Sequence, residues 1–151
     1  MRRHLTPPIQ PPDWREGFGL VRLRDTSPGE IHALLRTAYD DARLDTGLHH
    51  TAEGWWWATR TDAEFDPDLC LAVRAPTGQL AAFALVWNSS FIKDLVVAPQ
   101  WQRRGIATAL LGEIFSLLSA RGFDRVELKV LRENLRAKLL YRRAGFVEVD
   151  A

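Results

Sequence analysis

Residues 96–111 read V-V-A-P-Q-W-Q-R-R-G-I-A-T-A-L-L and form the part of this chain best suited to bind an anion. The apolar run ending at Val97 predicts a strand that stops at Pro99, and Gly105 precedes apolar residues at helical spacing. The first turn of a helix leaves several backbone N–H groups unpaired at the positive end of the helix dipole. A strand, a glycine-bearing loop and a helix start in this order therefore predict a diphosphate ligand.

The elements that must position this loop follow from apolar periodicity. Ser27, Pro28 and Glu30 form a capping-box pattern before a first helix. Helices are also expected over 105–120 and 135–144, and residues 44–68 predict a loop with a short irregular helix. Strands are expected over 18–24, 69–75, 79–87, 91–98, 125–131 and 146–149. Because the last two helices connect consecutive strands, the sheet should be mixed and contain a parallel pair.

The composition is that of one globular domain. The chain has 151 residues, of which 46% are hydrophobic and 26% charged. We place the domain at 18–151 and interpret the proline-rich residues 1–17 as a flexible arm. The longest apolar run is too short to cross a bilayer, and the first residues lack the apolar region of a signal peptide. These features, with the single Cys70, predict a cytoplasmic protein that has no disulfide and no membrane partner.

Charge is unevenly distributed along the chain. Carboxylates dominate residues 40–68, and basic groups dominate residues 100–143. This pattern is typical of a protein that binds an anionic ligand on one side and a cationic one on the other, although ordinary solvated faces explain it equally well. Cys70 lies in an apolar run and is expected to be buried and inert. The histidines share no spacing with Cys70 that would indicate a metal site.

Two separated patterns occur in the second half of the chain. The first is Val97-Ala98-Pro99 followed by Gln102-Arg103-Arg104-Gly105-Ile106-Ala107, and the second is Asn134-x-x-Ala137-x-x-x-Tyr141-x-x-x-Gly145-Phe146. Together and in this order they resemble the GNAT N-acetyltransferase superfamily, over roughly residues 92–147. The resemblance implies a single-domain α/β (α+β) fold, with a mixed, splayed sheet of about six strands and helices on both faces. It also implies acetyl-CoA bound in the gap of the sheet.

The resemblance further implies which residues hold the cofactor. Loop N–H groups would bind the pyrophosphate, and the strand before the loop would pair with the pantetheine arm. Positive charge opposes the dipole at a helix start, so phosphate contact is favoured over plain solvation for Arg103 or Arg104. Asn134 would serve as a helix cap and also lie beside the cofactor. The expected cofactor-binding set is Leu95, Val96, Val97, Gln102, Arg103, Arg104, Gly105, Ile106, Ala107, Thr108, Asn134, Ala137 and Tyr141.

Three residues are candidates for catalysis. Tyr141 is expected to protonate the departing thiolate, because a phenol has a pKa of about 10, close to that of the thiol; a plain core aromatic is the alternative. Histone-type members of the family have a glutamate base where this chain has Phe91. Asp94 and Glu127 are the remaining candidate bases, and surface carboxylates or a water chain are the alternatives. By strand alternation Asp94 faces away from the side of Phe91 unless a bulge intervenes.

These expectations combine into an acetyl-CoA-dependent N-acetyltransferase that acts directly on an amine in a ternary complex. Without a strong base, an α-amine or a small-molecule amine of lower pKa is favoured as the acceptor. Deprotonating an α-amine at pH 7 costs about 1.4 kcal/mol, against roughly 4.6 kcal/mol for a lysine side chain. The acidic 40–68 segment, with His49, His50 and Trp55–Trp57, could bind this amine, or the tryptophans could close the core.

The runner-up prediction is a non-catalytic acyl-CoA-binding regulatory or interaction module. Phe91 favours it, and so does the short segment after Phe146, where many members of the family add a strand. A partner chain, as in a homodimer, could complete that edge of the sheet, the sequence could be a trimmed form, or the edge could stay open. Nucleic acid is not expected as a partner, because the basic residues are dispersed over the half expected to hold acetyl-CoA.

Overall fold

The computed structural model describes residues 1–6, 9, 12, 14, 17–43 and 47–149. Within these residues, six strands form one sheet in the order β1-β6-β5-β4-β3-β2. The strands are β1 (Arg2–His4), β2 (Gly19–Val21), β3 (Cys70–Arg74), β4 (Leu80–Trp87), β5 (Phe91–Val97) and β6 (Arg125–Leu128). The helices are α1 (Pro28–Asp41), α2 (Ala52–Arg60), α3 (Ile106–Ala120) and α4 (Leu135–Arg143).

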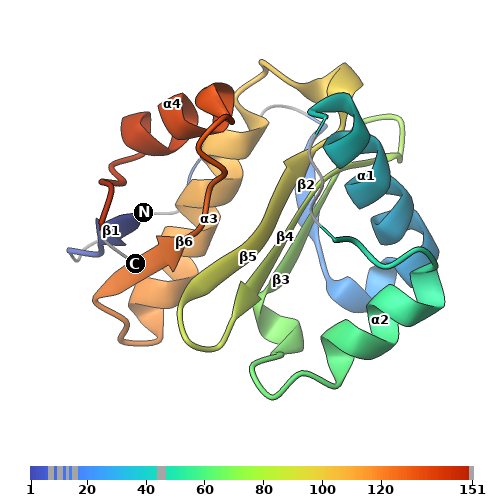
Figure 1. Cartoon of the computed structure of the whole chain (residues 1–151), viewed down its shortest axis with the longest axis horizontal. Helices are drawn as coiled ribbons and strands as arrows, with labels where there is room; N and C mark the ends of the chain where they lie inside the picture. Colours follow the sequence, from blue (N-terminus) through green and yellow to red (C-terminus); the bar gives the residue numbers. More distant parts are fainter. Residues whose placement is uncertain (7–8, 10–11, 13, 15–16, 44–46, 150–151) are drawn as a thin grey trace.

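The sheet is mixed and splayed, as predicted. Every pairing is antiparallel except that of β5 with β6, which run parallel and pair only at Phe91↔Glu127 and Ile92↔Leu128. Beyond these two positions the strands separate, and Figure 1 shows β5 and β6 diverging. One edge of β5 therefore faces a gap in the sheet, with its polar backbone groups free of a strand partner.

Helices cover both faces of the sheet, and alternation along the strands separates two cores. On β4, Ala82, Ala84 and Val86 pack against α3, in what we call the α3 core. Phe83 and Leu85 pack against α1 and α2, in the α1 core. Figure 1 shows the α1–α2 pair and the α3–α4 pair on opposite sides of the sheet. These features confirm the predicted α/β class. Within the described residues, no helix combines the length and apolar character needed to cross a bilayer.

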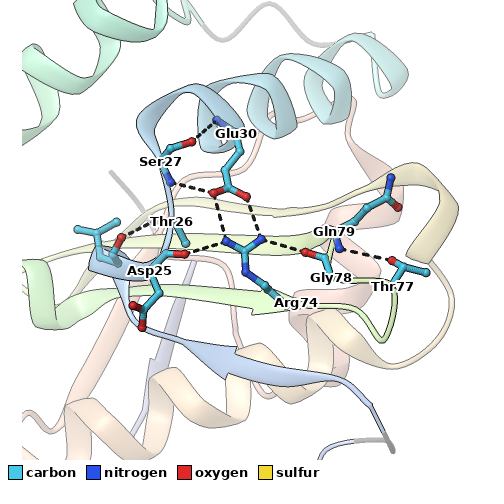
Figure 2. Close-up of polar contacts among 9 residues, drawn as sticks. Asp25, Thr26, Ser27, Glu30, Arg74, Thr77, Gly78 and Gln79 are labelled. Atoms are coloured by element: carbon cyan, nitrogen blue, oxygen red, sulfur yellow. Dashed lines mark hydrogen bonds and ion pairs between the residues drawn. The ribbon is translucent and has the colours of Figure 1, made fainter.

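The start of α1 is held by a polar network that the sequence only partly predicts. The capping box is confirmed: the Glu30 N–H donates to Ser27 Oγ at 3.2 Å, and the Ser27 N–H donates to the Glu30 carboxylate at 2.8 Å. Arg74 of β3 adds an ion pair to Glu30 at 2.9 Å and donates to the carbonyls of Asp25 and Gly78 (Figure 2). The Arg74 guanidinium lowers the pKa of the Glu30 carboxyl. This network fixes the N-terminus of α1 on the β3–β4 hairpin.

Two elements differ from their predicted form. The first predicted strand shortens to Gly19–Val21, because a 3-10 turn at Leu23–Asp25 follows it directly. The helix expected to be irregular is the regular α2, whose Thr51 cap accepts from the Gly54 N–H at 3.1 Å. Residues 44–46 of that predicted loop lie outside the described residues.

The N-terminal segment differs from the expected flexible arm. Arg2–His4 form β1, which pairs antiparallel with β6, and Leu5 is 3% exposed in the α3 core. Trp14 donates to the Glu113 carboxylate of α3 at 2.8 Å. The apolar side chains of this segment thus bury against the core, although Pro7, Pro8 and Pro11 lie outside the described residues.

The final strand predicted over 146–149 is wrong. Only Val147 bridges to Arg2, because Phe146 turns into the α3 core, where it is 2% exposed. β1 lies between β6 and Val147 and so covers the edge of β6 from within the same chain. This arrangement supplies a pairing that the sequence left open to a partner chain.

Candidate functional site

A cavity of about 560 Å³ occupies the gap between β5 and β6. Its wall comes from the C-terminal end of α1, the free edge of β5, the loop before α3, the end of β6 and one face of α4. Of the residues predicted from the sequence, those that line it are Asp94, Leu95, Val96, Val97, Gln102, Arg103, Gly105, Ile106, Ala107, Thr108, Asn134, Ala137 and Tyr141. Two motifs far apart in sequence therefore meet around one cavity.

The loop before α3 presents free backbone donors. The Gln102 N–H donates to the Pro99 carbonyl, but within the described residues no hydrogen bond uses the N–H groups from Arg103 to Thr108. Gly105 caps α3 with φ of 78° and without a side-chain cap. Arg103 also has positive φ, 62°, which is unfavourable for a residue with a side chain. Left-handed backbone at two alternate positions curls the loop into a concave anion site.

The free edge of β5 offers further backbone groups. The Ala98 N–H pairs with β4, whereas the Val97 carbonyl faces the gap, where it accepts from the Gln102 side-chain amide at 3.2 Å. By alternation the polar groups of Leu95 face the same way. Arg136 of α4, which the sequence analysis missed, donates to Gln102 Oε1 at 3.1 Å and also lines the cavity. A cation from α4 thus lies beside the loop of free N–H groups.

A bulge in β5 determines where Asp94 points. Leu85 pairs with Asp94 but Val86 pairs with Ile92, so Lys93 is an extra residue in the strand. Ile92 packs in the α3 core, whereas Val96 packs in the α1 core. The bulge changes the alternation, and Asp94 lies on the α1 side. The bulge that the sequence required for Asp94 to face this side is therefore present.

Asp94 shares the cavity wall with two phenols, those of Tyr39 and Tyr141. The Tyr39 hydroxyl of α1 donates a hydrogen bond to Asp94 Oδ1. Burial, then the negative charge of Asp94, raises the pKa of Tyr141 to about 12. The same two causes, in the same order, raise the pKa of Tyr39. Tyr39, Asp94 and Tyr141 come from α1, β5 and α4, so no local pattern could bring Tyr39 into the predicted site.

Asn134 and Tyr141 take the positions expected on α4. Asn134 Oδ1 accepts from the Ala137 N–H at 3.2 Å, which confirms the predicted helix cap. Tyr141 is 9% exposed, with its ring 5.6 Å from that of Phe146. Among the described residues, its hydroxyl has no hydrogen-bond partner. A phenol that lines a cavity and keeps its proton can donate to a ligand.

Two predicted residues lie elsewhere. Arg104 does not line the cavity, and its guanidinium lies 5.1 Å from the centre of the Trp101 ring. Glu127 is at the β1–β6 edge of the sheet, where its carboxylate pairs with Arg2 at 3.4 Å and Arg125 at 3.7 Å. The structure therefore does not support Glu127 as a base or Arg104 as a cavity residue.

The tryptophans do not form the predicted amine site. Trp55 is 4% exposed and packs edge-on against Phe83, and Trp56 packs against Phe65. Trp57 is exposed, and none of the three lines the cavity. Two tryptophans thus close the core, the alternative that the sequence left open. From the acidic segment, Asp41 does line the cavity.

The cavity wall fits a nucleotide thioester better than a small ion. Its free N–H groups and Arg136 match the phosphates of such a ligand. Its unpaired strand edge matches an amide-containing arm. The buried indole Nε1 of Trp101, also in this wall, has no hydrogen-bond partner in the described part of the chain. Cys70 does not line the cavity; its thiol is buried, as predicted, and burial raises its pKa to about 12.

The profile of the Acetyltransferase (GNAT) family matches residues 29–146, a range that includes both motifs and the cavity. The chain belongs to this family. Its GNAT fold is also found in a GCN5-related N-acetyltransferase from Sphaerobacter thermophilus, with a TM-score of 0.74 and 29% identity over 95% of this chain and 45% of that one.

Two curated relatives give the scale of the sequence similarity. Mycothiol acetyltransferase of Clavibacter michiganensis is 41% identical over 85 residues, which are 54% of this chain and 28% of that protein. The [Ribosomal protein bS18]-alanine N-acetyltransferase of Escherichia coli is 30% identical over 105 residues, 67% of this chain and 71% of that protein. The chain thus spans under a third of the mycothiol acetyltransferase and most of the ribosomal-protein enzyme.

Proposed function

We propose that this GNAT protein is an acetyl-CoA-dependent N-acetyltransferase that acetylates an amine directly in a ternary complex. The observation that carries the proposal is one cavity shared by a cradle of free N–H groups, an unpaired strand edge, a carboxylate and a protonated phenol. An anion site alone would serve a binding module. The carboxylate and phenol at its other end add groups suited to acid–base chemistry.

Acetyl-CoA is the proposed acetyl donor. The N–H groups from Arg103 to Thr108 bind its pyrophosphate, with Arg103 and Arg136 neutralising phosphate charge. Leu95 and Val97 pair with the pantetheine amides like an added strand, and the Val97 carbonyl exchanges its Gln102 contact for this pairing. Arg104 is left out of this set because it lies outside the cavity wall.

The proposed reaction forms one bond and breaks one. The amine nitrogen bonds to the carbonyl carbon of the acetyl thioester, the C–S bond breaks with its electron pair going to sulfur, and the products are an acetamide, free CoA and one proton. Tyr141 gives its hydroxyl proton to the sulfur and regains a proton, by way of water, from the reacting nitrogen. Tyr141 is protonated at neutral pH, as an ordinary phenol is, and burial and Asp94 raise its pKa further. Asp94 holds the incoming ammonium, which loses its first proton to Asp94 or to water.

The acceptor is proposed to be a small-molecule amine or the α-amine of a peptide or protein. Among the described residues of the wall, the only carboxylates are Asp94 and Asp41 of α1, so the site has few groups that could act as a strong base. An α-amine costs roughly 3 kcal/mol less to deprotonate at pH 7 than a lysine side chain. The name of the E. coli relative, a ribosomal-protein alanine N-acetyltransferase, supports this class.

Release of free CoA with a panel of amines tests this proposal. The panel contains peptides with a free α-amine, the same peptides blocked at the α-amine but carrying lysine, and small aliphatic amines. Turnover that is highest on free α-amines is expected. Tight acetyl-CoA binding without turnover on any amine would instead favour the acyl-CoA-binding module. Cytoplasmic location, the absence of nucleic-acid and membrane partners and a homodimer stay predictions of the sequence.

A further inference from the structure

The contact between Tyr39 and Asp94 has no counterpart in the motifs that predict the site. Tyr39 lies in the last turns of α1, and its hydroxyl donates to Asp94 Oδ1 across the α1–β5 contact. Both side chains line the cavity. In the described part of the chain Asp94 makes no other hydrogen bond and no ion pair, so Oδ2 is uncommitted.

A half-buried carboxylate without a cation partner is costly unless a ligand supplies the positive charge. Several basic side chains line the same cavity, among them Lys93 and Arg136, yet none pairs with Asp94. Asp41, two residues after Tyr39 and the last residue of α1, brings a second carboxylate to the same wall. This end of the cavity therefore suits a cationic ligand, whereas the loop before α3 suits an anionic one.

From this arrangement we infer that Tyr39 is a positioning residue for acceptor recognition: it fixes the Asp94 carboxylate so that Oδ2 receives the ammonium of a positively charged primary amine. The inference rests on the proposed acetyl transfer and names the acceptor class of the same site. Tyr39 acts through Asp94 and touches neither the acetyl donor nor the sulfur.

The rest of α1 makes this contact rigid. Its N-terminus is clamped by the capping box and by Arg74, as Figure 2 shows, and its middle packs in the α1 core through Leu35 and Ala38. A clamped helix delivers the Tyr39 hydroxyl to a fixed place. Because the bulge at Lys93 turns Asp94 to the α1 side, the two features act on the same carboxylate. A preorganised anion binds a cation without the cost of ordering its own side chain.

Steady-state kinetics on Tyr39→Phe tests the inference, with the amine that gives the fastest CoA release in the panel. Loss of a hydrogen bond to a charged group predicts a KM for the amine raised about tenfold or more, with kcat changed less than about threefold. The Kd of acetyl-CoA, measured by calorimetry, should stay within about twofold of the wild-type value. Phenylalanine keeps the ring that packs in the α1 core.

A double-mutant cycle separates positioning from packing. If Tyr39 acts through Asp94, adding Tyr39→Phe to Asp94→Asn should change the amine KM no further. Asp40→Asn is the matched control, because Asp40 is exposed on the same helix end and does not line the cavity; it should leave the amine KM unchanged. Additive effects of Tyr39→Phe and Asp94→Asn, or an unchanged KM in Tyr39→Phe, would overturn the inference. No turnover by the wild-type protein would overturn the proposed function itself.

Discussion

The ionisation of the two tyrosines is the most direct test of the site geometry, because it needs no ligand. The chain contains only Tyr39 and Tyr141, and both line the cavity with Asp94. Tyrosinate absorbance therefore reports this group of three residues alone. With a pKa of about 12, Tyr141 should be only about 3% ionised at pH 10.5, where an ordinary phenol is about three quarters ionised. The folded protein should thus show almost no tyrosinate at this pH.

The same shift links pH to stability. Because the pKa of Tyr141 rises from 10.0 in the unfolded chain to about 12 in the fold, the folded state binds more protons in that range. This contribution to stability is fully present below pH 10 and is lost as pH rises towards 12, a change of roughly 3 kcal/mol. The raised pKa of Tyr39 acts with the same sign. Urea unfolding at pH 8, 10 and 11 measures the loss.

Two variants show whether Asp94 contributes. Asp94→Asn should lower the pKa of both tyrosines but leave it above 10, because burial is the larger cause for each. Asp40→Asn, which removes an exposed charge nearby, should leave both unchanged. Circular dichroism at each pH confirms that the protein is folded, and the same titration in guanidinium gives the ordinary value. Two tyrosines that titrate near pH 10 in the folded protein would refute the proposed geometry.

The remaining predictions concern the loop, the acid and the N-terminal strand. Gly105→Val should weaken acetyl-CoA binding about tenfold in calorimetry, because φ is 78° there and a side chain distorts the loop. Gly78→Val is the control: φ is 89° in a hairpin away from the cavity, so both variants should lose about 1–2 kcal/mol of stability, but Gly78→Val should leave binding unchanged. Tyr141→Phe should lower kcat about a hundredfold and leave the acetyl-CoA Kd within about twofold; equal kcat would remove it from the mechanism. Arg3→Ala should lower the free energy of urea unfolding by about 2 kcal/mol, since Arg3 donates to the Ala144 carbonyl at 2.9 Å and lies over the Phe115 ring.

Local signals in the sequence predicted the parts of this protein that are built locally. Ser27 and Glu30 lie three residues apart, so the capping box could be recognised without a fold. The loop before α3 is likewise one continuous segment, and its free donors follow from the start of a helix at Gly105. The same holds for Asn134, whose cap is made to its own helix.

The failures concern contacts between distant segments. Phe146–Val149 alternates like a strand, but β1 occupies the neighbouring edge and only Val147 forms a bridge. Tyr39 continues the helical pattern of α1, and nothing near it in sequence indicates that its hydroxyl reaches Asp94. Glu127 has a residue type suited to a base, yet the N-terminal strand supplies Arg2 to pair with it. In each case the deciding partner lies tens of residues away.

One backbone irregularity links the shape of the cavity to its charge. β5 pairs with β6 at Phe91 and Ile92, and the bulge at Lys93 follows at once. A bulge bends its strand and increases the local twist, which accounts for the separation of β5 from β6 directly after this point. The extra residue also reverses the alternation, so Asp94 faces α1 and Tyr39 while Leu95 and Val97 keep their polar backbone groups towards the gap. The bulge thus opens the space for a ligand and turns the Asp94 carboxylate to the end of the cavity that suits a cationic ligand. Deleting Lys93 should therefore remove both features together.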